Sequence, residues 1–130
     1  MTNKSKKILT EISAGELLDK ISILEIKLDN ISDKEKLVEI NKEYKSLEET
    51  RKSNIEITEN LQTLINQLGE INLKLWNIEE KKRMCEKNSD FGENFIQLAR
   101  NVYISNDKRA KIKSDINELL GSNIKEVKSY

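Results

Sequence analysis

The feature that most constrains this sequence is its lack of helix breakers: its 130 residues include no proline and only four glycines. Proline interrupts a helix because its ring removes an N–H donor and clashes with the preceding turn, and loops are commonly built from proline and glycine. A chain with so few breaks favours long helices. Aromatic residues make up 5% of the chain and charged residues 35%, which is also typical of long helices rather than of a thick globular core.

Capping signals indicate where these helices begin. The Ser-x-x-Glu pattern satisfies free N–H groups in a first helical turn, and it occurs at residues 13–16, 32–35 and 53–56. Asp90 followed by Glu93 offers a fourth start. We therefore expect a helix after each signal, with a turn at residues 30–32 between the first two and a third helix over residues 55–87.

The third segment carries the clearest apolar repeat. Its seam alternates spacings of three and four, the pattern of a helix that packs along one face. The seam residues are Ile57, Leu61, Leu64, Leu68, Ile71, Leu75, Ile78 and Cys85, interrupted only by Lys82. A helix over residues 55–87 would be on the order of 50 Å long at about 1.5 Å per residue, so the bundle should be elongated.

The last segment keeps one apolar register from Phe95 to Leu119, but Ser105 and Arg109 occupy two of its inward positions. The helix either continues with a polar layer or breaks at residues 105–107, and we prefer continuity. Gly121 should end it, because glycine readily adopts the left-handed conformation of a helix stop.

We interpret the chain as all-α, an elongated antiparallel coiled-coil-like bundle of three to four helices. Residues 1–12, which include Lys4, Lys6 and Lys7, read as a flexible leader. Residues 13–120 form a single helical-bundle domain. Residues 121–130 are a C-terminal tail.

Composition excludes several functions. Basic and acidic residues both number 23, so no net charge attracts nucleic acid or an anionic membrane. No apolar run approaches the roughly 18 residues of a membrane span. Histidine, the usual general base and zinc ligand, is absent. Cys85 has no disulfide partner and the start lacks a secretory signal, which favours the cytoplasm. We expect no nucleic acid, membrane, metal or cofactor.

Polar residues cluster in the last segment where apolar ones would be expected. A guanidinium there could hold an anionic ligand through paired hydrogen bonds. Alternatively, the cluster is a polar layer that fixes helix register, which is the interpretation we favour. The residues are Arg100, Tyr103, Ser105, Asn106, Asp107 and Arg109.

Charges on the first segment also interleave with apolar residues. Glu25 is our candidate partner for Arg109, and the alternative is that these charges form exposed pairs such as Glu16 with Lys20. The basic run at residues 108–113 is balanced by nearby acids, which favours a solvated face.

Three features of the third segment have competing interpretations. Trp76 shares a face with Ile65 and Gly69, which suits either a subunit interface or packing within the chain. Cys85 lies on the apolar seam and should pack as a small hydrophobe. The glutamates near residue 80 are a poor metal site because Lys81, Lys82 and Arg83 lie among them.

Several stretches resemble a known family. They include Leu75-Trp76-Asn77-Ile78-Glu79 and, more widely, residues 12–27, 90–92, 98–103, 106–110, 116–117 and 126–130. Together they resemble the uncharacterised bacterial domain-of-unknown-function family 6165. The family has an aliphatic residue where Ala14 stands and an arginine or a similar residue where Lys108 stands, and residues 35–67 match it only in helical character.

The resemblance implies no assigned activity. It implies an association with bacterial surface-polysaccharide and glycosyltransferase genes, and therefore an accessory role in such a pathway. Its signature also includes Lys128-Ser129-Tyr130, which suggests that the tail folds back onto the bundle. Its other polar positions coincide with our ligand-binding candidates: Glu16, Asp19, Lys20, Glu25, Trp76, Glu79, Arg100, Tyr103, Asn106, Asp107 and Arg109.

Two functions remain open. The first is a non-catalytic helical interaction module, a homodimer that engages a protein partner or an anionic small molecule. The second is a small all-α enzyme in which Arg100 and Arg109 clamp an anionic substrate and Glu25 or Asp107 acts as acid or base. Enzyme residues should converge on a concave pocket, whereas those of a module should pair with one another.

Overall fold

The computed structural model describes residues 6–129, and within that range the chain is all-α, with four helices and no strand. The helices are α1 (Ala14–Asn30), α2 (Lys34–Asn54), α3 (Glu59–Lys87) and α4 (Glu93–Leu120). The prediction of an all-α bundle is confirmed. Lys4 of the predicted leader and Tyr130 of the predicted tail lie outside the described residues.

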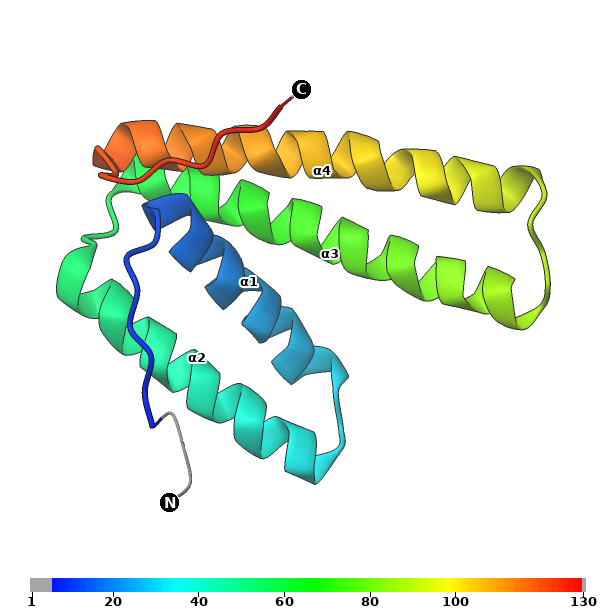
Figure 1. Cartoon of the computed structure of the whole chain (residues 1–130), viewed down its shortest axis with the longest axis horizontal. Coiled ribbons are helices and arrows are strands. Elements are labelled where there is room, and N and C mark those ends of the chain that lie inside the picture. The colour runs from blue at the N-terminus through cyan, green and yellow to red at the C-terminus, as the bar shows by residue number, and fades with distance from the viewer. Residues whose placement is uncertain (1–5, 130) are drawn as a thin grey trace, which may run out of the picture.

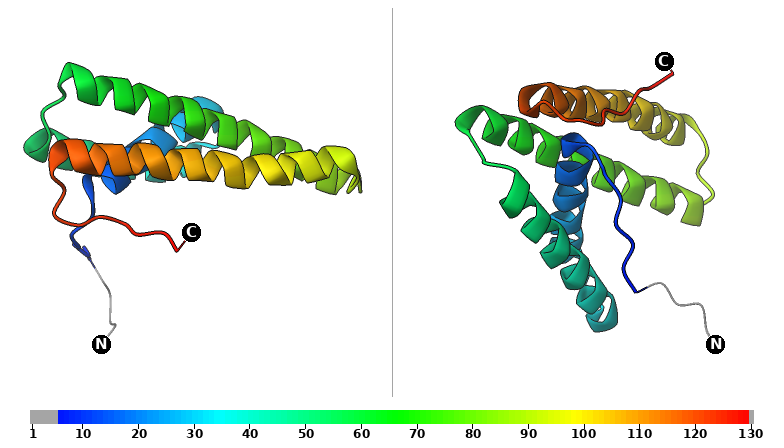
Figure 2. Two further views of the ribbon diagram at one scale, coloured as in Figure 1. Left: turned by 90° about the horizontal axis from the view of Figure 1, so that it is seen from above. Right: turned by 60° about the vertical axis from the view of Figure 1, so that its left-hand side comes forward.

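The helices form two hairpins. α3 and α4 lie side by side as a long pair, while α1 and α2 form a shorter pair that crosses it at one end (Figure 1). Turned views show α1 against the long pair and α2 farther out (Figure 2). Among the described helices, α2 packs against α1 alone, and it contains no buried residue. The yellow-green end of the α3–α4 pair therefore extends beyond α1 and α2.

Two apolar clusters hold this arrangement together. The larger joins α1, α3 and α4, and its centre is formed by Leu61, Leu68 and Ile116, which are fully buried. The smaller lies in the projecting part of the long hairpin, where Cys85 packs with Leu98. The predicted burial of Cys85 is confirmed. Along α4, Ser105 and Arg109 fall between the residues of the two clusters.

Some helix limits follow the predicted signals. The Ser13 hydroxyl accepts a hydrogen bond from the Glu16 N–H at 3.1 Å and caps α1. Asp33, one residue after the predicted Ser32, caps α2. α4 runs without a break through residues 105–107, which confirms continuity. Gly121 ends it with φ 62°, the left-handed conformation expected of a helix stop.

Two predicted starts are wrong. α2 continues through residues 53–54, and α3 begins after Thr58, whose hydroxyl accepts from the Leu61 N–H at 3.3 Å. The chain turns where Ile55 packs against the larger cluster, which leaves Ile57 outside the helix and 40% exposed. Asp90 does not cap α4 either. Its carboxylate accepts from the Gly92 N–H, and Gly92 provides no side-chain cap.

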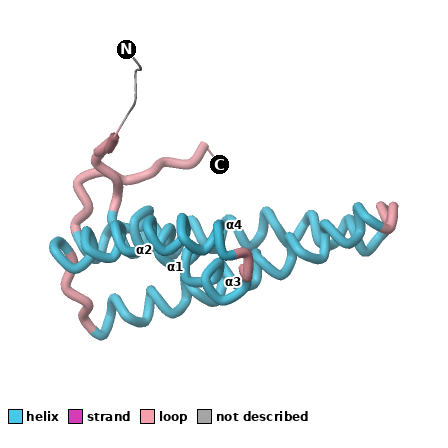
Figure 3. The backbone as a smooth tube through the Cα atoms, turned by 90° about the horizontal axis from the view of Figure 1, so that it is seen from below, coloured by secondary structure: helices cyan, strands magenta, loops and turns pink. Residues whose placement is uncertain are grey.

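The leader and the tail leave the bundle on the same side (Figure 3). Asn123 of the tail donates to Glu11 of the leader at 2.6 Å, and the Ser122 hydroxyl accepts from the Ala14 N–H at 3.1 Å. The tail then runs back along α4. None of the described helices is both long and apolar enough to cross a membrane.

Candidate functional site

A buried polar network joins α1, α3 and α4. Its centre is the Asn72 amide, which donates to the Asp19 carboxylate at 2.8 Å and to the Ser22 hydroxyl at 3.2 Å. The Asn72 carbonyl oxygen accepts from Arg109 at 3.3 Å, and Arg109 also donates to the Asn106 side chain at 2.8 Å. Every polar end of Asn72 is thereby satisfied. The amide links one face of α1 to the polar positions of α4.

Lys113 extends the network toward the tail. Its ammonium donates to Glu16 at 2.8 Å and lies 3.5 Å from Asp19 and 3.7 Å from Glu126. Its side chain is only 12% exposed. The hydrogen bond from Lys113 lowers the pKa of Glu16 below its usual value, despite partial burial, and Lys20 adds to this effect. Burial alone would lower the pKa of Lys113, but the three carboxylates raise it.

A cavity lies beside this network. It has a volume of about 350 Å³ and lies between α1, α3 and α4. Trp76, Glu79 and Arg109, all predicted site residues, line it together with Arg83. Glu79 is paired with Lys82 at 3.3 Å, so its charge is already balanced.

The other predicted residues of α4 lie apart from the network. Arg100, Tyr103 and Asp107 are exposed, and Tyr103 retains 56% of its accessible surface. The structure therefore does not bring Arg100 and Arg109 together as a clamp in any described cavity. Lys20 is also exposed and pairs with Glu16 at 3.7 Å.

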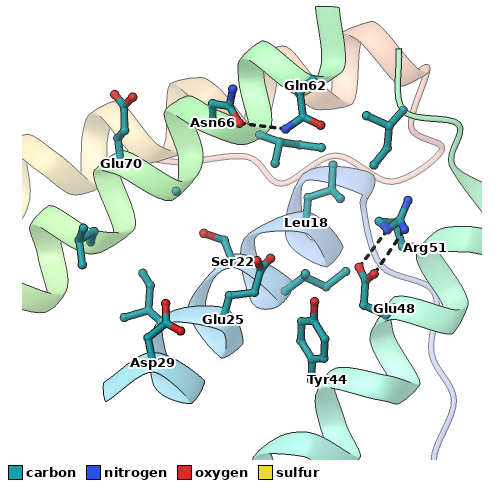
Figure 4. Close-up of a pocket in the computed structure, with 16 residues that line it drawn as sticks. Leu18, Ser22, Glu25, Asp29, Tyr44, Glu48, Arg51, Gln62, Asn66 and Glu70 are labelled. Carbon is teal, nitrogen blue, oxygen red and sulfur yellow. Dashed lines mark hydrogen bonds and ion pairs between the residues drawn. The ribbon is translucent and has the colours of Figure 1, made fainter. Parts of the chain in front are cut away.

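The largest of the cavities described for residues 6–129 is a groove on the other side of α1. It lies between α1, α2 and α3 and has a volume of about 680 Å³ (Figure 4). Apolar side chains form much of its wall, and Gly69 leaves its α3 side open, since nothing lies within 4 Å of the place a Cβ would take. The apolar residues are Leu18, Ile21, Ile26, Ile57, Ile65 and Leu73.

The groove is acidic. Among the described residues, four carboxylates line it, and the one guanidinium that does so, that of Arg51, is already held by Glu48 at 2.9 and 3.3 Å. The groove walls displace water from Glu25, and the charges of Glu48 and Asp29 repel it, so its pKa is raised. Partial burial likewise raises the pKa of the Tyr44 phenol, and Glu25 and Glu48 add to the effect. The carboxylates of this groove therefore lack a matching number of cations.

Replacing Glu25 with glutamine is expected to stabilise the protein at pH 7. Because the pKa of Glu25 is raised by folding, its ionised form opposes folding above that pKa. The gain in the free energy of unfolding should be about 0.5 kcal/mol or less, since the group reaches solvent. The gain should shrink as the pH falls through the raised pKa and vanish below the ordinary glutamate value of 4.5, where the group is neutral in both the folded and the unfolded state. Urea unfolding between pH 7 and about pH 4 measures the difference.

Glu43→Gln is the matched control, because Glu43 is an exposed glutamate of α2 outside the groove. Glu16 affects stability in the opposite direction. Because its pKa is lowered by folding, its ionised form stabilises the fold at pH values above its ordinary pKa, and this contribution is lost at lower pH. The wild type and the Glu25→Gln variant share that loss, so it cancels when their free energies of unfolding are compared. An equal gain in the free energy of unfolding in the two variants would contradict the claim that the ionised form of Glu25 opposes folding.

Two sequence-based assignments are wrong. Arg109 pairs with two amide oxygens rather than with Glu25, because Glu25 faces the groove, away from α4. The basic run is not uniformly solvated either: Lys113 points into the network because it lies one turn from Arg109 on the same face of α4. Sequence reasoning also missed Asn72, whose one signal was its position one turn from both Leu68 and Trp76.

A search of curated proteins gave no match. A search of solved structures gave none either. A family model described as "Family of unknown function (DUF6165)" matches residues 8–130. Because this match covers nearly all of the sequence, the chain belongs to that family of unknown function.

Proposed function

We propose that this protein is a non-catalytic interaction module that forms a homodimer, in which the leader of each copy binds in the groove of the other. The observation that carries the proposal is the groove itself. It is the largest described cavity, apolar side chains form much of its wall, and its four carboxylates face a single guanidinium. An occupant with apolar and basic side chains would satisfy both properties.

The described leader has this chemistry. Lys6 and Lys7 are followed directly by Ile8 and Leu9, which are 79% and 84% exposed. Two adjacent exposed aliphatic side chains bury little surface in the monomer and gain from a partner. None of residues 6–12 lines the groove of its own chain. The leader of a second copy can therefore supply the missing cations and apolar side chains.

An exchange of leaders is reciprocal. A two-fold symmetric dimer contains two identical leader–groove contacts, so each contact holds the other at a high effective concentration. Each leader need then bind only weakly. The centre of the polar network contributes stability rather than contacts to this partner, since Asp19 bonds to Asn72 and Lys113 bonds to Glu16 within the chain.

The enzyme alternative has less support. Glu25 lies in the groove and Arg109 in the network, so the proposed acid or base is separated from the proposed clamp. Catalysis by Asp107 stays a prediction. So do the cytoplasmic location and the connection to surface-polysaccharide pathways, the latter resting on the resemblance alone.

A charge-exchange experiment tests the dimer. One variant carries Glu25→Lys and Glu70→Lys in the groove, and the other carries Lys6→Glu and Lys7→Glu in the leader. Each alone places like charges at both contacts and should dimerise at least tenfold more weakly, a change of about 1.4 kcal/mol. Mixed together they should form a one-to-one heterodimer, because opposite charges then meet at both contacts. Sedimentation velocity measures all three samples.

The double variant Glu39→Lys and Glu43→Lys is the matched control, because both residues are exposed on α2 outside the groove. It should dimerise like the wild type. A wild type that stays monomeric at micromolar concentrations, or a mixture that stays monomeric, would overturn the proposal. If Tyr103→Glu alone dissociates the dimer, the interface is the exposed face of α4 instead.

A further inference from the structure

A small basic cavity lies where the tail passes over α4, on the part of the network nearest the surface. Its volume is about 200 Å³, and its cationic lining residues are Arg109, Lys113 and Lys128. Among residues 6–129, the only carboxylate that lines it is that of Glu126, which comes from the tail. The cavity therefore has more cations than anions in its wall.

Arg109 is the cation whose charge is least balanced. Both of its hydrogen bonds end on amide oxygens, which are neutral. Within residues 6–129, no carboxylate oxygen lies within 4.0 Å of its guanidinium. A half-buried guanidinium with free donor capacity is well suited to a planar or tetrahedral oxyanion, since its N–H groups can bind two oxygens at once.

Glu126 occupies this cavity only loosely. Its carboxylate lies 3.7 Å from Lys113 and 3.2 Å from Lys128, and its side chain is 46% exposed. The tail is held more firmly before this point, by Ser122 on α1 and by Lys125, which contacts Glu118 at 2.9 Å. A rotation of the Glu126 side chain alone can therefore displace its carboxylate and leave Lys128 in place. The path of the tail along α4 can be followed in Figure 1.

We propose that Arg109, Lys113 and Lys128 form a binding site for the phosphoryl group of a small molecule, and that Glu126 occupies this site when no ligand is bound. Glu16 and Asp19 already pair with Lys113, so the charges of Arg109 and Lys128 remain for a dianion when Glu126 leaves the cavity. The amide of Asn106, which also lines the cavity, holds the guanidinium in place from the same helix. This site is separate from the groove and does not depend on the proposed dimer.

Isothermal titration calorimetry with inorganic phosphate at constant ionic strength tests the site. Glu126→Gln keeps the size of the side chain and removes its charge. Phosphate should then bind about threefold to tenfold more tightly, because it no longer competes with the Glu126 carboxylate for the site. Glu118→Gln is the matched control, since that exposed carboxylate pairs with Lys125 away from the cavity. It should leave the affinity unchanged.

Arg109→Lys should weaken phosphate binding at least tenfold, because the ammonium group of lysine cannot bind two phosphate oxygens side by side as the planar guanidinium does. Arg100→Lys, an exposed arginine of α4 outside the cavity, should not. Acetate should bind more weakly than phosphate. A phosphate monoester titrated in parallel distinguishes free phosphate from an esterified ligand.

Three results would overturn the proposal: no phosphate binding by the Glu126→Gln variant at millimolar concentration, equal affinity in Glu126→Gln and Glu118→Gln, or unchanged binding in Arg109→Lys. Because Glu126→Gln removes only an exposed carboxylate, its gain in affinity can be measured even if the Arg109 variant is poorly folded.

Discussion

Asn72→Ala is expected to lower the free energy of unfolding by about 3 kcal/mol, the largest effect of any single change considered for this protein. Asn72 is buried and its amide contacts Asp19, Ser22 and Arg109 at once. Removing it leaves a buried carboxylate without its closest donor and a guanidinium without one of its two acceptors. Charged groups left unpaired in the interior are the most costly ones.

Urea unfolding of wild type and variant measures this loss. Asn77→Ala is the matched control, because Asn77 is an exposed asparagine of the same helix, and it should change stability by less than about 0.5 kcal/mol. A loss below about 1 kcal/mol for Asn72→Ala, or equal losses in the two variants, would show that the network contributes little to stability. The slope of the unfolding transition should be the same in all three proteins, because none of them changes the surface exposed on unfolding.

The number, type and approximate length of the helices could be predicted from local signals. Ser13 caps α1 and Gly121 ends α4 because a hydroxyl oxygen and a missing side chain act within one turn of the chain. The start of α3 could not be predicted as reliably. Ser53 and Thr58 both offer a capping oxygen, and packing of Ile55 against the larger cluster decides between them.

The arrangement of the two hairpins lay beyond the sequence. An apolar stripe indicates which face of a helix is buried, but it says neither which helix covers that face nor at what angle. Gly69 illustrates the point. The face that it shares with Ile65 and Trp76 suited either a subunit interface or packing within the chain, and the structure leaves Gly69 in the wall of an open groove.

The candidate site was partly predictable for a similar reason. Arg109 and Asn106 stood out because polar residues occupied positions that the apolar register would fill. Asn72 and Lys113 gave weaker signals, since one is flanked by apolar residues and the other is part of a balanced run of charges. Their roles depend on distances between α1, α3 and α4 that only the folded chain defines.

Gly15→Ala is expected to destabilise the protein by about 2 kcal/mol, although alanine is the better helix former. A Cβ at Gly15 would lie 2.7 Å from the carbonyl oxygen of Lys113 and 3.0 Å from the Asn117 side chain. The Gly15 N–H donates to that same Asn117 oxygen at 2.7 Å. Backbone atoms cannot rotate away as a flexible side chain can, so α1 and α4 must separate where the larger apolar cluster joins them.

Gly69→Ala is the matched control, because it makes the same chemical change within a helix but no atom lies within 4 Å of the added Cβ. It should stabilise the protein by about 1 kcal/mol, through helix propensity and the lower entropy of the unfolded chain. The two variants should therefore differ by about 3 kcal/mol in chemical unfolding, with opposite signs relative to wild type. Stabilisation by both substitutions would mean that α1 does not approach the backbone of α4 this closely. In that case the hydrogen bonds of Gly15 and of the tail to this end of the bundle would also have to be longer, since the same close approach positions them.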